Sequence, residues 1–396
     1  MDYIYKQPKY FKEFRCIGGE CPETCCRDWS IDWKIEDLDK IRSTSSSDTL
    51  NELIQQSFEL SDDKKYFSIK LCADGRCPFL NRNSGLCDIQ KELGEEYLGR
   101  VCRQYPRHYI EHGNQIIRWC VTSCPAVTDI LFNMENAVDT EKIIARDQNC
   151  LDRTTMVVDH SEAIKMDPIK QVRMELFDFY TDMLLDKKRD LDTSIILTAL
   201  AVKHFTDAEK NHNYSVIPQM ANDLKKQLNN MKITQSVEDL KPNYQLKFKL
   251  VNNMLVKFFG NNSRAINISA LHDGKQLNIE NYLNGIDNFN KAFDNKPFVL
   301  NNIIMNTFYD LNMPIGKFKR SLFENYSYFV LTAATYKTVA SAIGFSSDNI
   351  INDFKLCVSE MNRCFSHTVR LADMIIEDML QTGITTPAHL ALIIKG

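Results

Sequence analysis

The chain has 396 residues, of which 44% are hydrophobic and 25% are charged, and its formal net charge is -4. This length and composition are typical of a folded globular protein and exclude a largely disordered chain. The acidic balance argues against a protein that mainly coats nucleic acid, because the phosphate backbone is bound by an excess of Lys and Arg.

Neither a membrane anchor nor a signal peptide is predicted. The longest apolar runs, such as residues 195–202, are too short to span a bilayer, and the N-terminus has no charged segment leading into an apolar one. We therefore expect a cytoplasmic protein, in a reducing compartment where cysteines remain thiols unless a metal binds them.

The first third of the chain has weak periodicity. Up to about residue 33 the sequence reads as irregular, because Gly18, Gly19 and Pro22 interrupt any regular element. Further elements are predicted from local patterns: helices at 34–41, 49–60 and 89–98 (ending at Gly99), a short strand at 66–71, and a hairpin formed by 107–111 and 115–119.

Cysteines dominate this part of the chain. Ten of the thirteen lie between residues 16 and 124: Cys16, Cys21, Cys25, Cys26, Cys72, Cys77, Cys87, Cys102, Cys120 and Cys124. A zinc ion or an iron-sulfur cluster needs about four ligands close together, and cysteines that recur at such short intervals in the sequence can supply them as thiolates. A disulfide scaffold is the weaker explanation, because the number is odd and the chain is long and shows no export signal. Some of the ten are then ordinary buried thiols, since one centre needs about four ligands.

The sequence after Cys124 predicts helices. Pro125 suits the first turn of a helix that runs to about residue 136. Beyond about residue 167 most segments show a period near 3.6: 170–185, 191–208, 244–259, 322–343, 369–380, and a last helix that begins at Thr386-Pro387. The helix from residue 322 is apolar on most faces and is expected to be central. Cys357 and Cys364 share one face of a predicted helix, which favours core packing.

These patterns predict a mainly α protein with two domains. Residues 1–150 form a cysteine-rich metal-cluster module with a short β-hairpin, and residues 151–396 form an all-helical domain.

Four arginines lie near the later cysteines in the sequence and give this stretch a local positive charge. Arg100, Arg103, Arg107 and Arg118 face only Glu111 within this short span. Guanidinium groups there would offset the charge of an anionic cluster or bind a carboxylate or phosphate. A solvated basic face explains the same pattern equally well.

Several motifs in the first third resemble the flagellin lysine N-methylase family, FliB. They are Cys77-Pro78-Phe79-Leu80, Leu86-Cys87-Asp88-Ile89, Leu93-Gly94-Glu95-Glu96 and Cys102-Arg103-Gln104-Tyr105-Pro106-Arg107, preceded by Cys21-x3-Cys25-Cys26. The wider cysteine pattern is similar to that of YkgJ-type zinc- or iron-chelating proteins. Over the helical remainder, the resemblance is limited to length and general character.

The resemblance implies methyl transfer from S-adenosylmethionine to surface lysines of flagellin, with an iron-sulfur cluster in the enzyme. A 4Fe-4S cluster is the expected type and zinc is the alternative. The residues themselves identify neither donor nor acceptor: no Gly-x-Gly-x-x-Gly follows an apolar strand. The Cys-x3-Cys-x2-Cys triplet of radical enzymes is also absent, because Asp28 and Val127 occupy the third position.

The resemblance also selects candidate site residues. The first metal-ligand candidates are Cys25, Cys77, Cys87 and Cys102, with Cys16, Cys21, Cys26, Cys120 and Cys124 in reserve. Arg103 and Arg107 are candidates for binding the methyl donor. Because tyrosine hydroxyls and aromatic faces can contact cations without a fixed counter-charge, the catalytic candidates are Tyr105 and Tyr109, together with the aromatic Trp29, Trp33 and Trp119. Each aromatic residue has packing around the cluster as its alternative role.

Two other functions remain open at this stage. An iron-sulfur redox or metal sensor would show a reversible spectral change without affinity for S-adenosylmethionine. A zinc-stabilised interaction module would be colourless and contain zinc.

Overall fold

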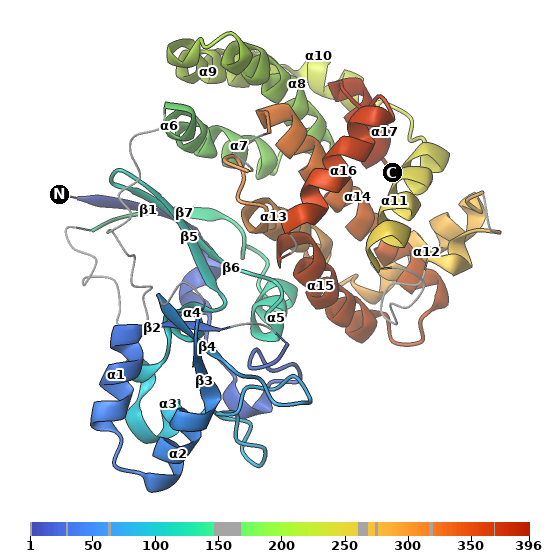
Figure 1. Cartoon of the computed structure of the whole chain (residues 1–396). Coiled ribbons are helices and arrows are strands. Elements are labelled where there is room, and N and C mark those ends of the chain that lie inside the picture. Colours follow the sequence, from blue (N-terminus) through green and yellow to red (C-terminus); the bar gives the residue numbers. More distant parts are fainter. Residues whose placement is uncertain are drawn as a thin grey trace.

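The computed structural model describes residues 2–28, 31–61, 65–145, 168–259, 268–273, 276–316, 320–367 and 369–396. It is mainly helical, and a cysteine-rich N-terminal part with short strands precedes a helical part (Figure 1). The predicted fold class is therefore confirmed. Among the described helices, none combines the length and apolarity needed to cross a lipid bilayer.

A four-stranded sheet lies between the two parts (Figure 1). Its strands, in the order β5-β6-β1-β7, are β5 (Arg107–His112), β6 (Gln115–Cys120), β1 (Tyr3–Pro8) and β7 (Thr140–Ala145). β5 and β6 form the predicted antiparallel hairpin, while β1 pairs parallel to β6 and antiparallel to β7. The prediction of an irregular N-terminus was wrong over β1, whose last four residues are buried.

The rest of the N-terminal part is a small module around a three-stranded sheet. Its strands are β2 (Asp32–Lys34), β4 (Tyr66–Ile69) and β3 (Phe58–Leu60), in the order β2-β4-β3. Its helices are α1 (Ile35–Thr44), α2 (Asp48–Ser57), α3 (Asp88–Leu93) and α4 (Arg100–Gln104). The predicted helix 89–98 is shorter than expected, because Gly94 adopts a φ of +110° and ends α3.

The helical part is built around one buried helix. Its members are α5 (Pro125–Asn133), α6 (Pro168–Glu175), α7 (Phe177–Leu184), α8 (Leu191–Lys210), α9 (Ile217–Leu228), α10 (Met231–Glu238), α11 (Tyr244–Phe259), α12 (Ile279–Ala292), α13 (Val299–Asp310), α14 (Leu322–Ser346), α15 (Ile350–His367), α16 (Val369–Gln381) and α17 (Pro387–Ile394). α14 is buried on nearly every face and packs against α8, α11, α12, α13, α15, α16 and α17, as its sequence predicted.

Local sequence explains why α14 begins and packs as it does. Ser321 and Glu324 form a reciprocal capping box at its first turn. Gly344 of α14 and Gly285 of α12 allow the two backbones to approach so closely that a Cβ at either position would collide with the opposite helix.

The described residues form two hydrophobic cores. The smaller core lies within residues 31–98, and the larger one joins the four-stranded sheet, α5 and the later helices. The division at residue 150 stays a prediction, because the larger core includes strands from the first 150 residues.

Candidate metal centre and adjoining pocket

Eight cysteines from distant parts of the chain line one cavity of 270 Å³, which we call the thiol cavity. They are Cys16, Cys21, Cys25, Cys26, Cys77, Cys87, Cys102 and Cys124. All described cysteines are free thiols. Apolar side chains, including Trp33 and Phe79, line the same cavity. Cys77 and Cys124 are buried, whereas Cys16 and Cys25 are exposed at its edge.

Short local structures bring three of these cysteines into the cavity. Cys77 opens a tight turn in which Leu80 N donates to Cys77 O at 3.1 Å, and Cys77 N donates to Cys26 O at 2.9 Å. Leu80 forms a β-bridge with Cys87, which directly precedes α3. Cys102 lies within α4. The sequence between these cysteines thus serves mainly to return the chain to the cavity.

Cys26, Cys77, Cys87 and Cys102 form a group of mutual neighbours, which we call the first thiol set. Burial raises the pKa of Cys102, and the thiolates of Cys26, Cys87 and Cys77 raise it further. Burial likewise raises the pKa of Cys77 to about 12, with contributions from Cys26 and Cys87. Four anionic thiolates in a cavity lined largely by apolar side chains repel one another, and a metal cation would relieve that repulsion.

Backbone amides already point at these sulfur atoms. The backbone of Phe79 hydrogen-bonds to the Cys77 thiolate, and the backbones of Ile89 and Gln90 hydrogen-bond to the Cys87 thiolate. These bonds lower the pKa values of Cys77 and Cys87, whereas burial raises them. Amide hydrogen bonds to sulfur are among the interactions that stabilise metal-bound thiolates. The donor set therefore fits a zinc ion or an iron-sulfur centre.

The thiols line the cavity without forming a closed ligand set. Among the described residues, no group of three or more His, Cys, Asp and Glu side chains already converges as metal ligands. Metal binding would therefore require the thiols to turn inward.

The structure groups the candidate cysteines differently from the sequence analysis. Cys77, Cys87 and Cys102 lie together as neighbours, but the fourth member of their group is Cys26, whereas the sequence analysis chose Cys25. Cys120 is fully buried in β6, outside the thiol cavity, where its amide donates to the Tyr10 hydroxyl at 3.0 Å. The ligand set itself stays a prediction.

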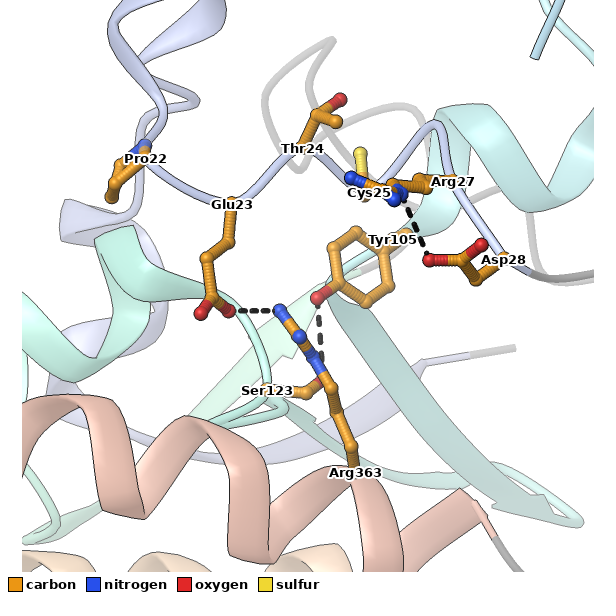
Figure 2. A pocket seen from close by; sticks show the side chains of 9 residues that line it. All are labelled: Pro22, Glu23, Thr24, Cys25, Arg27, Asp28, Tyr105, Ser123 and Arg363. Carbon is orange, nitrogen blue, oxygen red and sulfur yellow. Dashed lines mark hydrogen bonds and ion pairs between the residues drawn. The ribbon is translucent and has the colours of Figure 1, made fainter. Parts of the chain in front are cut away.

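A second, more open pocket of 640 Å³ adjoins the thiol cavity, and we call it the interface pocket. It is lined by Pro22, Glu23, Thr24, Cys25, Arg27, Asp28, Tyr105, Ser123 and Arg363 (Figure 2). Arg363 extends from α15 to form an ion pair with Glu23, and Arg27 Nε lies 3.0 Å from Asp28 Oδ2. The pocket thus presents two carboxylates and two guanidinium groups at the junction between the cysteine-bearing loop and the helical part.

Tyr105 lines both the interface pocket and the thiol cavity. Its hydroxyl lies 3.2 Å from Ser123 Oγ (Figure 2). Burial raises the pKa of Tyr105, and the neighbouring thiolates of Cys124 and Cys25 raise it further. The phenol therefore stays protonated at neutral pH and acts as a hydrogen-bonding group.

The other predicted residues occupy different places. Arg103 and Arg107 line the thiol cavity, whereas Tyr109 lies on β5 outside both pockets. Trp33 packs edge-on against Phe58 in the small core. Trp119 is buried beside Tyr309 in the large core, and Trp29 lies outside the described residues.

Sequence reasoning did not identify Glu23, Asp28, Ser123 or Arg363 as site residues. The first three are within three positions of a cysteine, and this was a usable signal. Nothing local marked Arg363, because it is distant in sequence and belongs to a helix with an ordinary amphipathic pattern.

A buried polar network holds the turn that carries Ser123 and Cys124. Asp310 Oδ2 accepts hydrogen bonds from Thr122 Oγ1 at 2.7 Å and from Asn362 Nδ2 at 2.5 Å. Asn362 Oδ1 in turn accepts from Ser123 N at 3.0 Å. The second oxygen, Asp310 Oδ1, is buried and has no hydrogen-bond partner in the described part of the chain. Burial raises the pKa of Asp310 to about 7, although hydrogen bonds from Thr122, Asn362 and Asn306 oppose the shift.

This carboxyl should make stability depend on pH. Its folded pKa lies above the ordinary value of 3.8, so its stabilising effect is complete below about pH 4 and is lost as pH rises through 7. We expect the unfolding free energy to fall by roughly 2–3 kcal/mol between pH 5 and 8.5 through this group, and Asp310→Asn to remove that part of the slope. Urea unfolding of both proteins at the two pH values measures it. Identical slopes would contradict this assignment.

Comparison with known proteins finds two family models that match this chain. The family model "FliB lysine N-methylase C-terminal domain" matches residues 177–393, and the model "Putative zinc- or iron-chelating domain" matches residues 15–125. The second match covers every cysteine of the thiol cavity. No solved structure matches the chain.

Curated relatives are similar over a third of the chain. "Flagellar biosynthetic protein FliU" of Salmonella muenchen is 28% identical over 135 residues, which are 33% of this chain and 79% of that protein. "Lysine-N-methylase" of Salmonella typhimurium is 30% identical over 139 residues, or 33% of each chain, and the protein of that name in Salmonella choleraesuis matches equally. The matches thus span only a third of the lysine-N-methylases. Because the C-terminal family model covers more than half of the chain and the resemblance seen in the sequence is confirmed, this protein belongs to the FliB lysine N-methylase family.

Proposed function

We propose that this protein transfers methyl groups from S-adenosylmethionine to the ε-amino groups of lysines on flagellin, in the interface pocket beside a metal-bearing thiol cavity. Family membership supports methylation of protein lysines, and the names of two relatives state lysine methylation. The name of a third relative places it in flagellar biosynthesis, which supports flagellin as the substrate. The free thiols suit the reducing cytoplasm.

The charge pattern of the interface pocket is the observation that carries this proposal. Glu23 and Asp28 are paired with Arg363 and Arg27 in the structure. On binding, the carboxylates would exchange these partners for the sulfonium and the lysine ammonium, and the guanidinium groups would bind the donor's carboxylate. The volume of 640 Å³ falls within the range of small-molecule sites. Arg103 and Arg107 remain candidates for the same carboxylate from the side of the thiol cavity.

The reaction needs alignment and the loss of one proton. The neutral lysine nitrogen attacks the methyl carbon in line, the carbon–sulfur bond breaks, and sulfur keeps the electron pair as a neutral thioether. A carboxylate at Glu23 or Asp28 attracts the ammonium and can accept its proton before attack. The Tyr105 oxygen, held by Ser123, contacts the amine in the pocket. Cys26, Cys77, Cys87 and Cys102 would hold a metal centre, which would link the loop that carries Cys26, next to the wall of the interface pocket, to the small module.

The test is direct measurement of methyl transfer. The protein is purified anaerobically, analysed for iron, sulfide and zinc, and incubated with S-adenosylmethionine and flagellin. We expect mass gains on flagellin lysines in steps of one methyl group, abolished when the donor is omitted. Unmodified flagellin beside a protein with full metal content would refute the proposal and favour the sensor or the zinc-stabilised interaction module.

A further inference from the structure

The cysteines of the thiol cavity divide into two groups of four. Beside the first thiol set, Cys16, Cys21, Cys25 and Cys124 line the same cavity, and we call these four the second thiol set. They come from the loop after the 3-10 helix Lys9–Glu13 and from the residue that precedes α5. One four-coordinate metal ion or one four-iron cluster uses about four thiolates, so eight thiols exceed the need of a single centre.

Members of the second set are one another's neighbours. Cys16, Cys21 and Cys25 lie within ten residues of one another on a single loop, and Cys124 lines the same cavity from the residue before α5. In the first set, Cys77 N donates a hydrogen bond to Cys26 O at 2.9 Å, and Cys87 and Cys102 line the cavity beside them. Contact between the sets runs through the consecutive residues Cys25 and Cys26, whose thiols share a hydrogen bond.

Local structure presents the second set as ligands. Cys21 N donates to Gly18 O at 3.1 Å, which closes a turn that returns Cys21 toward Cys16, and Gly18 N lies 3.4 Å from Cys16 Sγ. At the other end, the backbone amides of Ala126 and Val127 in the first turn of α5 hydrogen-bond to the Cys124 thiolate. Such N–H groups stabilise a bound thiolate, as they do in the first set.

The loop that carries Cys16 and Cys21 is held against the module. Gly19 approaches the backbone of Ser84 so closely that a Cβ would collide with its carbonyl oxygen, and Gly18 adopts a φ of +56° beside Leu86. Leu86 directly precedes Cys87 of the first set. The fold therefore places the two sets next to each other at fixed positions, with Cys25 at the wall of the interface pocket.

We propose that Cys16, Cys21, Cys25 and Cys124 form a second thiolate-ligated centre for zinc or an iron-sulfur cluster, distinct from the centre of Cys26, Cys77, Cys87 and Cys102. This centre joins the N-terminal loop to the first turn of α5 and lies nearer the interface pocket. The inference is independent of methyl transfer, because metal content is measured without donor or flagellin.

The experiment compares metal content in variants of each set. The full chain is reconstituted anaerobically, once with zinc and once with ferrous iron and sulfide, and bound metal per chain is determined with the visible spectrum. We expect Cys16→Ser and Cys102→Ser each to halve the metal content of the wild-type protein, and the double variant to retain only background. Cys364→Ser, a change outside both sets, should leave the content unchanged.

Two results would overturn the second centre. One is wild-type metal content in Cys16→Ser, and the other is complete loss of metal in Cys16→Ser and Cys102→Ser alike, which would indicate a single shared centre. Circular dichroism verifies that each variant is folded. Since Cys16 is exposed, its replacement should disturb packing little, and Cys21→Ser must reproduce the result from a second position.

Discussion

Replacing Cys77 with alanine should abolish metal binding by the first thiol set and unfold the small module while the helical part stays folded. Cys77 is buried and contributes to the small core; its amide donates a hydrogen bond to Cys26 O, and its carbonyl accepts one from Leu80 N. Loss of one of four thiolates should lower metal affinity by more than the roughly 10- to 100-fold that removal of an outer-sphere partner costs.

The structural effect should be large because the module has little else to hold it together. Its core consists of a few side chains between residues 31 and 98, on short helices and a three-stranded sheet of three- and four-residue strands. Cores of this size rarely suffice alone, and a metal that binds only the folded form adds its binding free energy to folding.

Hydrogen exchange and metal analysis together measure this prediction. In Cys77→Ala, amides of α1, α2 and β4 should lose protection, whereas those of α14 should keep it. Cys357→Ala is the matched control, since Cys357 is equally a buried cysteine but lies on α15 in the large core. Cys357→Ala should retain the metal. Equal metal content in the two variants would rule out Cys77 as a ligand.

The sequence predicted the elements whose signal is local. The hairpin of β5 and β6, α5 with its first-turn proline, and the cap at Thr386 all depend on residues within one or two turns, and the structure confirms them. β1 and β7 carried no comparable signal: β1 is a strand because β6 and β7 flank it, and these partners lie more than 100 residues away. Long-range pairing of this kind cannot be read from local patterning.

The same limit applies to the site. Spacing was enough to gather Cys77, Cys87 and Cys102, because short loops between cysteines restrict where the chain can go. It could not decide between Cys25 and Cys26, since their spacings to every other cysteine differ by only one position and the backbone path decides where their side chains lie. The Arg363–Glu23 ion pair depends on how α15 packs against α5 and α13, which a single sequence does not reveal.

Tyr105→Phe should lower the rate of methyl transfer by about 10- to 100-fold with little change in metal content. The substitution removes the hydroxyl that Ser123 holds at 3.2 Å and keeps the ring that separates the thiol cavity from the interface pocket. The amine nitrogen gains positive charge as it attacks, and a hydrogen bond to a charged partner contributes about 1.5–3 kcal/mol, which corresponds to this range of rates.

Because the loss concerns alignment of the amine, it should appear in kcat at saturating S-adenosylmethionine, while the donor's KM changes little. Burial and the neighbouring thiolates keep the pKa of the phenol high, so titration of Tyr105 should not shape the pH–rate profile near neutrality. Tyr97→Phe is the control: Tyr97 packs against the small core and Lys40 and lines neither pocket, whereas Tyr105 packs against the large core. A wild-type kcat in Tyr105→Phe would contradict a contact between Tyr105 and the acceptor amine. An equal loss of kcat in Tyr97→Phe would show that the effect comes from lower protein stability and not from the pocket.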